Sequence, residues 1–274
     1  MAYPTFSYSG SSVTLPFPSS LETDITLPFD TVNLDNATID IYDHGEQYDK
    51  RITKISFHLS TMSQSNLNTF LVSTARAKEI QFSPGSSGVH IFGPDKGDAN
   101  SFDVTCVFSG TPKIGFYPLR YFLCELIVTN TGSFPVYSLP SEIDDGLFTI
   151  GDVTNLFMPQ RGFEPNQTYT ISVSHTENST PQIFDRGSDG DSVFVKLLIP
   201  CNETKAAALL YYLTHTIRAQ VFQITAQAYY YIFGMDHGGN GPYYVQLSSP
   251  KINVKMLNYN NWQVSFQLKK VDAP

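Results

Sequence analysis

Apolar and polar residues alternate over many short stretches of this chain, which is the spacing of half-buried β-strands. Ile55, Phe57 and Leu59 alternate with polar neighbours, and the stretch 262–268 alternates with one polar face. The pattern predicts strands at 39–41, 52–59, 80–82, 90–92, 102–108, 114–116, 121–128, 194–199, 221–224 and 262–268. We therefore expect a mainly β protein.

Two stretches change to helical spacing, with apolar residues three and four positions apart. The first predicts an amphipathic helix over 63–77, with Thr61 or Ser63 as its N-cap. The second predicts a helix over 203–219, preceded by a cap region at 200–202. Each helix lies between an early and a middle strand.

The stretch 41–82 occurs twice. Shifted by 142 residues it aligns without a gap on 183–224, with 11 identities in 42 positions. Ile-Phe-Gly-x-Asp-x-Gly recurs at 91–97 and 232–238, and Pro-Lys-Ile recurs at 112–114 and 250–252. The retained polar and glycine residues include the pairs Asp43/Asp185, Gly45/Gly187, Asp49/Asp191, Asp95/Asp236 and Arg76/Arg218. This order indicates a tandem duplication of one domain.

The duplication divides the chain into four parts. Residues 1–20 are either an arm that docks on a neighbour or a first edge strand. The first domain then spans 21–135, and the second spans 166–274. Between them, 136–165 form a packed linker and the first strand of the second domain.

Composition excludes some classes of function. The chain has 25 acidic and 17 basic residues, a formal net charge of -8, which disfavours gripping DNA or RNA. Its cysteines, Cys106, Cys124 and Cys201, are unmatched between the repeats and are expected to be reduced core residues. We expect no signal peptide at the start, and the apolar run 116–128 is too short to span a bilayer.

No motif for catalysis appears. The six histidines lack metal-ligand spacing, and His44, His58 and His215 correspond to Arg186, Pro200 and Ser73 in the other repeat. We therefore predict no catalytic, cofactor-binding or metal residues, and expect that the protein is not an enzyme.

The polar positions retained in both repeats allow two interpretations. Asp43 with Gly45 and Asp95 with Gly97 suit turns, although paired carboxylates could also serve acid–base chemistry or calcium binding. The loop 185–191 is the best calcium candidate, but it lacks the closing Glu of an EF-hand. Arg76 and Arg218 suit the dipole at helix C-termini, and a subunit contact is the alternative.

The order of elements resembles the tail-tube domain of tailed bacteriophages, which tail-tube, distal-tail and baseplate-hub proteins share. The stretches that carry the resemblance are 54–59, 63–77, 79–83, 91–95, 102–108 and 120–128, and in the second repeat 196–199, 203–219, 220–225, 232–236 and 262–268. The resemblance implies two tandem β-sandwich domains, each with a flanking helix.

It further implies a structural virion protein, made in the bacterial host cytoplasm and located in the virion tail. Six such domains form a ring around a DNA channel, so three chains are favoured and a hexamer is possible. Implied partners are neighbouring tail-tube and tail-tip proteins, with DNA passing unbound and no membrane insertion. If so, the acidic excess predicts a net negative channel wall; the alternative is that the excess serves only to keep the protein soluble.

Two alternatives to a distal-tail or hub protein stay open. One is a duplicated tail-tube subunit. The other is a carbohydrate- or receptor-binding β-sandwich module, which the 16 tyrosines support weakly and which requires exposed aromatic residues on loops.

Overall fold

The structure is a computed structural model of the 274-residue chain. It describes residues 4–33, 39–45, 49–75, 78–84, 90–96, 104–117, 121–132, 149–150, 153–156, 166–168, 171–175, 181–185, 192–218, 220–224, 243–258 and 261–271. We call residues 4–132 the first half and residues 149–271 the second half.

The first half consists of strands and one α-helix, which continues into a π-helical turn. In chain order its elements are β1 (Thr5–Tyr8), β2 (Ser11–Thr14), β3 (Ser20–Thr26), β4 (Phe29–Asn33), β5 (Ile39–Asp43), β6 (Lys50–Leu59), α1 (Thr61–Thr69), the π-turn η2 (Phe70–Thr74), β7 (Ile80–Ser83), the 3-10 turn η4 (Pro94–Lys96), β8 (Val104–Phe108), β9 (Lys113–Tyr117) and β10 (Tyr121–Asn130).

The second half repeats this order. Its elements are β11 (Thr149–Ile150), β12 (Val153–Leu156), β13 (Asn166–Thr168), β14 (Ile171–His175), β15 (Pro181–Asp185), β16 (Ser192–Asn202), α2 (Glu203–Tyr211), the π-turn η6 (Tyr212–Ile217), β17 (Phe222–Ile224), β18 (Tyr243–Leu247), β19 (Lys251–Asn258) and β20 (Asn261–Val271).

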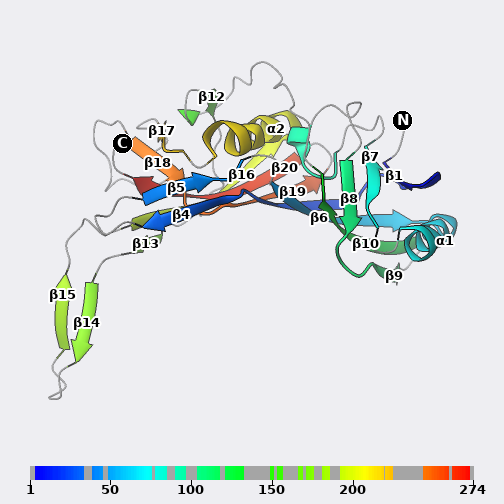
Figure 1. Ribbon diagram of the computed structural model, residues 1–274, viewed down its shortest axis with the longest axis horizontal. Coiled ribbons are helices and arrows are strands. Elements are labelled where there is room, and N and C mark those ends of the chain that lie inside the picture. The colour runs from blue at the N-terminus through cyan, green and yellow to red at the C-terminus, as the bar shows by residue number, and fades with distance from the viewer. Residues whose placement is uncertain are drawn as a thin grey trace.

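Strand pairing follows the same plan in both halves. Strand β10 pairs with β6, β8 and β9, and β20 pairs with β16, β18 and β19. Strand β7 pairs with β1 and β8, as β17 pairs with β11 and β18. The expected mainly β fold, with one helix in each repeat, is confirmed (Figure 1).

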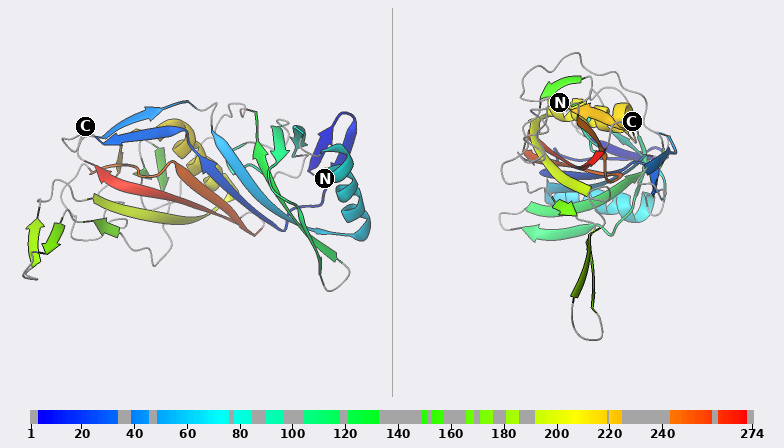
Figure 2. Two further views of the ribbon diagram at one scale, coloured as in Figure 1. Left: turned by 60° about the horizontal axis from the view of Figure 1, so that its bottom comes forward. Right: turned by 90° about the vertical axis from the view of Figure 1, so that its left-hand side faces the viewer.

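The two halves share one antiparallel sheet of 16 strands, and the hairpins β4–β5 and β14–β15 are separate from it. The hairpins differ in position. Hairpin β4–β5 lies along the body of the molecule, whereas β14–β15 extends away from it (Figures 1 and 2). The sandwiches expected as two units are therefore hydrogen-bonded into one continuous sheet.

The buried face of this sheet and the helices form one apolar core that runs through both halves. Leu21, Ile55 and Phe57 contribute from the first half, and Val254 and Phe266 contribute from the second. Burial of such side chains is the main favourable contribution to folding.

Both helices begin with a side-chain cap. Ser60 Oγ accepts a hydrogen bond from Ser63 N at 3.2 Å, so the predicted cap at Thr61 or Ser63 is wrong, because Ser60 already satisfies the first turn. In the second helix Asn202 Oδ1 accepts from Lys205 N at 2.9 Å, within the predicted cap region. Both helices end in a π-turn at corresponding positions, a feature that is frequent at functional sites.

Residues 5–14 form two strands at the edge of the sheet, which agrees with the edge-strand interpretation of this segment. Strands β1 and β2 form a hairpin through Ser9 and Gly10, whose φ angles are 46° and 81°, and β1 pairs with β7. Phe6 packs on Phe82 with ring centroids 5.3 Å apart. The predicted strand at 90–92 is wrong: these residues form a turn that leads into η4.

The pairing registers also correct one detail of the repeat. Cys124 and Val264 correspond, because Cys124 lies opposite Phe57 and Val264 lies opposite Ile199, 142 positions later. Ile114 lies opposite Cys124 and Val254 lies opposite Val264, so Ile114 and Val254 also correspond. The Pro-Lys-Ile motif would instead match Ile114 with Ile252. A slip of two residues keeps every side chain on the same face, so the motif alone does not reveal it.

Candidate functional site

The two halves meet edge to edge through β3 and β19. Strand β3 pairs with β6 on one side and with β19 of the second half on the other, with Leu21 opposite Met256 and Asp24 opposite Asn253. The Asn253 side chain donates hydrogen bonds to Asp24 at 2.8 Å and to Glu22 at 3.2 Å. The sheet thus passes from one half to the other without a break (Figure 2).

A charge cluster around the buried residues Arg218 and Asp49 reinforces this joint. Arg218, at the end of η6, donates to both carboxylate oxygens of Asp43 at 2.5 and 2.8 Å and to those of Asp49 at 3.2 and 3.3 Å. It also donates to Thr214 O at 2.8 Å, which satisfies a carbonyl in the last helical turn. The hydrogen bonds from Arg218 hold the pKa of Asp43 below its ordinary value, although partial burial acts in the opposite direction. Arg218 therefore lies at the helix end, as predicted, and its carboxylate partners belong to the first half of the same chain.

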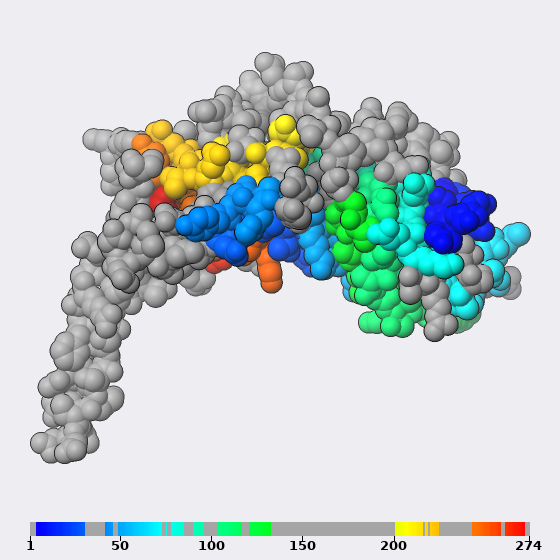
Figure 3. Space-filling model, in the orientation of Figure 1, coloured from blue at the N-terminus to red at the C-terminus, as the bar shows by residue number. Residues whose placement is uncertain are grey.

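A third contact places the loop before β8 on the second-half helix. The 3-10 turn η4 packs against α2. Arg51 pairs with both oxygens of Asp95 at 2.6 and 2.5 Å and donates to Phe92 O at 2.7 Å, which fixes this loop. A β-carbon on Gly93 would lie 3.8 Å from Leu210 of α2. In the space-filling view the second-half helix region (yellow) lies against first-half atoms (blue) (Figure 3).

The corresponding surface of the first half is exposed. Val72 is 62% exposed, whereas its counterpart Thr214 is fully buried. Phe116 of β9 is 72% exposed, whereas its counterpart Met256 of β19 is 4% exposed. In the second half the first half packs on this surface through η4 and β3. On the first half, Val72 and Phe116 are exposed, whereas Leu71 is half-buried and Ala75 is buried.

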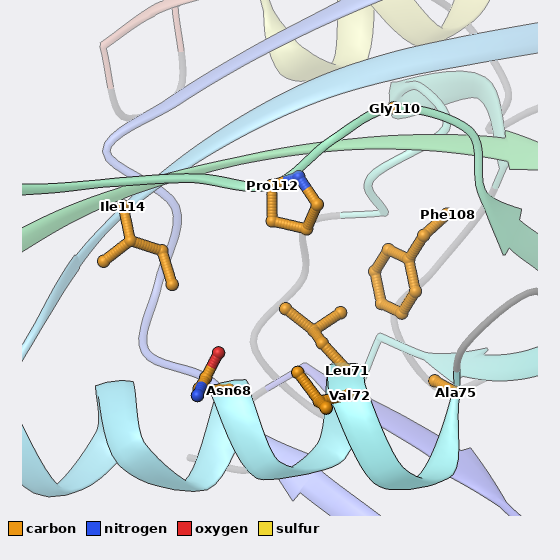
Figure 4. A pocket seen from close by; sticks show the side chains of 8 residues that line it. All are labelled: Asn68, Leu71, Val72, Ala75, Phe108, Gly110, Pro112 and Ile114. Carbon is orange, nitrogen blue, oxygen red and sulfur yellow. The ribbon is translucent and has the colours of Figure 1, made fainter.

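A groove lies within this exposed surface, between the helix and the β8–β9 connection (Figure 4). Its volume is about 360 Å³, and Leu71 and Val72 point from the helix toward Pro112 across it. It is lined by Asn68, Leu71, Val72, Ala75, Phe108, Gly110, Pro112 and Ile114. The second-half counterparts of its helix residues, Leu210, Leu213, Thr214 and Ile217, are all buried.

Each half also has a strand with one unpaired edge among the described strands, β9 in the first half and β13 in the second. Within the described part of the chain, β9 pairs only with β10, and β13 pairs only with β16. Their counterparts β19 and β3 pair with each other. Strand β13 corresponds to β3. Asn166 of β13 lies opposite Phe194, and Asp24 of β3 lies opposite Ile52; both members of the second pair come 142 positions earlier in the chain. An unpaired strand edge exposes main-chain donors and acceptors that another strand can bind.

The outer face of the strands near the joint carries charges of both signs. On β3, β6, β9, β10 and β19 it has five lysines and three acidic residues, a net charge of +2: Lys50, Lys54, Lys113, Lys251 and Lys255 against Glu22, Asp24 and Glu125. Lys54 and Glu125 pair at 3.8 Å. This face would not supply the net negative wall that the overall composition suggests.

The described histidines do not gather into a site. His44 contacts Asp30 at 3.0 Å on the surface, and His58 lies exposed on β6. His90 is buried beside Phe82, and His215 stacks on Tyr211 with ring centroids 4.5 Å apart. His237 lies outside the described residues, as does the side chain of His175. A search of the described residues finds no group of three potential metal ligands.

The cysteines are free thiols, as expected, with Cys106 and Cys124 buried and Cys201 half-buried. Burial raises their pKa values to about 12, 11 and 12 in chain order, so the nucleophilic thiolate is disfavoured. The predicted calcium loop 185–191 lies outside the described residues, apart from Asp185 at the end of β15.

The retained Asp-Gly pairs have different roles. Asp43 Oδ1 accepts from Gly45 N at 2.9 Å and Gly45 has φ 98°, which confirms the predicted turn. Asp95 instead binds Arg51, and Gly97 lies outside the described residues. Sequence reasoning missed that Arg218 binds Asp43 and Asp49, although retention of both partners in both repeats was the signal. Arg76 and Asp191 lie outside the described residues.

No helix in the described part of the chain has the length and apolar character needed to cross a membrane. A scan against protein-family models and a search of curated proteins both return no match.

Proposed function

We propose that this protein is a structural component of a phage tail tip, a distal-tail or hub-type adaptor whose halves occupy two positions in a six-position ring around a DNA channel. Three chains complete this ring. Neighbouring tail-tube and tail-tip proteins bind its two faces, and DNA passes through it without specific contacts.

The observation that carries the proposal is the joint between β3 and β19. Two equivalent units are joined there by different edges, one contributing β3, which pairs with β6, and the other contributing β19, which pairs with β20. A contact between unlike surfaces of equivalent units can repeat from unit to unit, and it gives a ring when the rotation closes. Ring closure also removes exposed strand edges, which are a liability in a monomer.

The charges on the outer face modify one expectation. If that face lines the channel, its mixed charges provide scattered lysines rather than a continuous basic stripe, and neighbouring carboxylates weaken their attraction for phosphate. Passage without retention then depends on charge alternation, not on an acidic wall.

A carbohydrate- or receptor-binding module is less well supported. The large aromatic residues exposed in the described part of the chain, Tyr42, Phe116 and Tyr121, all lie on strands and not on loops. A duplicated tube subunit would use the same joint and differs in stacking ring upon ring.

Light scattering over a concentration series, with electron microscopy of the same samples, tests the proposal. A ring with three times the chain mass of 30.5 kDa is the expected result. Long stacked tubes would favour the tube subunit. A monomer at every concentration, together with the absence of the protein from purified virions, would contradict a tail-tip role.

A further inference from the structure

We infer that the face formed by α1, η2 and β9 binds the second half of another copy of this chain, in the arrangement that joins the two halves within one chain. This inference rests on the proposed ring and names the joint between its chains. The occupant is a second copy, because the internal joint contains three contacts whose sequence counterparts recur in the opposite halves of the chain.

The first contact is between strands. Strand β9 takes the place of β19, and β13 of the neighbouring chain takes the place of β3. Since Asn253 lies opposite Asp24 in the internal joint, the matching register puts Lys113 opposite Asn166 of the neighbour. Met256 is buried opposite Leu21, so the exposed Phe116 would face the counterpart of Leu21, which is Phe163 in the sequence. An exposed aromatic residue thus gains an apolar partner.

The second contact is between the helix and a loop. Within one chain, the loop that contains Phe92 and Gly93 packs on α2 through η4. The sequence repeats this loop as Ile232-Phe233-Gly234-Met235-Asp236 in the second half. The groove of about 360 Å³ beside Leu71 and Val72 is the corresponding surface on the first half. Apolar side chains from the repeated loop fit a groove lined mainly by apolar residues.

The third contact is between charges. Arg218 binds Asp43 and Asp49 across the internal joint. Subtracting 142 from Arg218 gives Arg76, and adding 142 to the two aspartates gives Asp185 and Asp191. All three residue types are retained, although only 11 of 42 positions are identical in this stretch. The internal joint uses Arg218 with Asp43 and Asp49. The corresponding set, Arg76 with Asp185 and Asp191, fits a joint between chains.

The position of β14–β15 agrees with this assignment. The hairpin β4–β5, which contributes Asp43, lies along the body, and Arg218 of the second half binds it. Its counterpart β14–β15, which ends at Asp185, extends away from the body of its own chain (Figure 1). A hairpin that binds a neighbouring chain is expected to lie where that neighbour would be.

Two single-sided variants test the joint. Phe116→Glu places a charge on the β9 side, and the pair Asp185→Arg with Asp191→Arg reverses the charge on the opposite side. Leu257→Glu is the matched control, since Leu257 is 50% exposed on β19 and outside the proposed surface. Thermal melting of each variant shows that the chain still folds. Each single-sided variant is expected to be monomeric by light scattering, whereas the control assembles like the natural protein.

Mixing the two single-sided variants gives the sharpest result. Each variant keeps the surface that the other lacks, so the mixture should form particles of two chains and stop there. Adding Arg76→Asp to the variant with Asp185→Arg and Asp191→Arg exchanges the positive and negative sides of the ion pair. This combined variant should therefore assemble again.

Failure of this joint and failure of the proposed ring give different experimental results. Rings that persist in Phe116→Glu and in the double aspartate variant would overturn this joint and leave the ring proposal standing. Open filaments of the natural protein that both variants abolish would support the joint and contradict the closed ring. A natural protein that never assembles, at any concentration or in virions, would overturn both.

Discussion

Arg218 forms a bidentate pair with Asp43, although 175 positions separate them in the sequence. The pair connects the end of the second-half helix to a hairpin of the first half, and Asp49 adds a second carboxylate. It ties together two units that a duplication placed in tandem.

Replacing Arg218 with Gln should destabilise the protein by about 3 kcal/mol, because it removes the cation that binds the 7% exposed Asp49 and Asp43 across the joint. Urea unfolding followed by tryptophan fluorescence would measure this through Trp262, which is buried in β20. Lys54→Ala is the control. It breaks an exposed pair with Glu125 and should cost less than about 1 kcal/mol. Equal effects of the two changes would contradict the structural role of Arg218.

The same pair predicts a pH dependence. The pKa of Asp43 is lowered in the folded protein, so the stability that its charge contributes is fully present above its unfolded pKa of about 3.9. This contribution is lost as the pH falls through the lower folded value. Unfolding free energies measured from pH 6 to pH 2 should therefore decline less steeply for Asp43→Asn than for the natural protein. Parallel curves would argue against the Arg218 contact.

Gly93 should tolerate no side chain. Its φ is 123°, and an added β-carbon would lie 2.8 Å from Asp95 Oδ1 and 2.9 Å from Arg51 Nη1, within a fully buried ion pair. Gly93→Ala should therefore cost at least about 3 kcal/mol, or about 6 to 12 °C in melting temperature.

Gly10→Ala is the matched control for this prediction. Gly10 also has a positive φ, 81°, but no atom lies within 4 Å of the added carbon. Only backbone strain remains, about 1 kcal/mol. Similar melting temperatures for the two variants would show that the ion pair around Gly93 is not as tight as described.

The three thiols should resist modification in the folded protein. Burial raises each pKa to about 11 or 12, so little thiolate is present at pH 8. A thiol reagent such as dithionitrobenzoate should react slowly with the native protein and with three thiols per chain after denaturation. Rapid reaction of Cys201 alone would indicate that its region opens in solution.

The alternation of apolar and polar residues predicted most strands well, because buried and exposed positions alternate along them in the same way. Strand β6 and the buried positions Ile55, Phe57 and Leu59 follow directly from that alternation. The cap at Ser60 and the turn at 90–92 were missed. A hydroxyl at any of three nearby positions can cap the helix, and the apolar residues of 90–92 are buried without strand pairing.

The joint was harder to predict for a different reason. Pairing of β3 with β19 depends on which edges two domains present to each other, and propensity contains no information about that choice. The retained arginine and aspartates did contain it, but each has an adequate local explanation as a helix-end or turn residue. Only the structure shows that Arg218 and Asp43 contact each other.

The pairing of β3 with β19 also means that the number of domains in any assembly of this chain is even. Both strands belong to one polypeptide, so this contact forms at an effective concentration fixed by the chain and survives any dilution. If the chains assemble as proposed, domains enter the assembly in twos, and a closed particle can contain four, six or eight of them but never five or seven. An error in copy number must add or remove a whole pair, which changes the circumference far more than the gain or loss of one domain would.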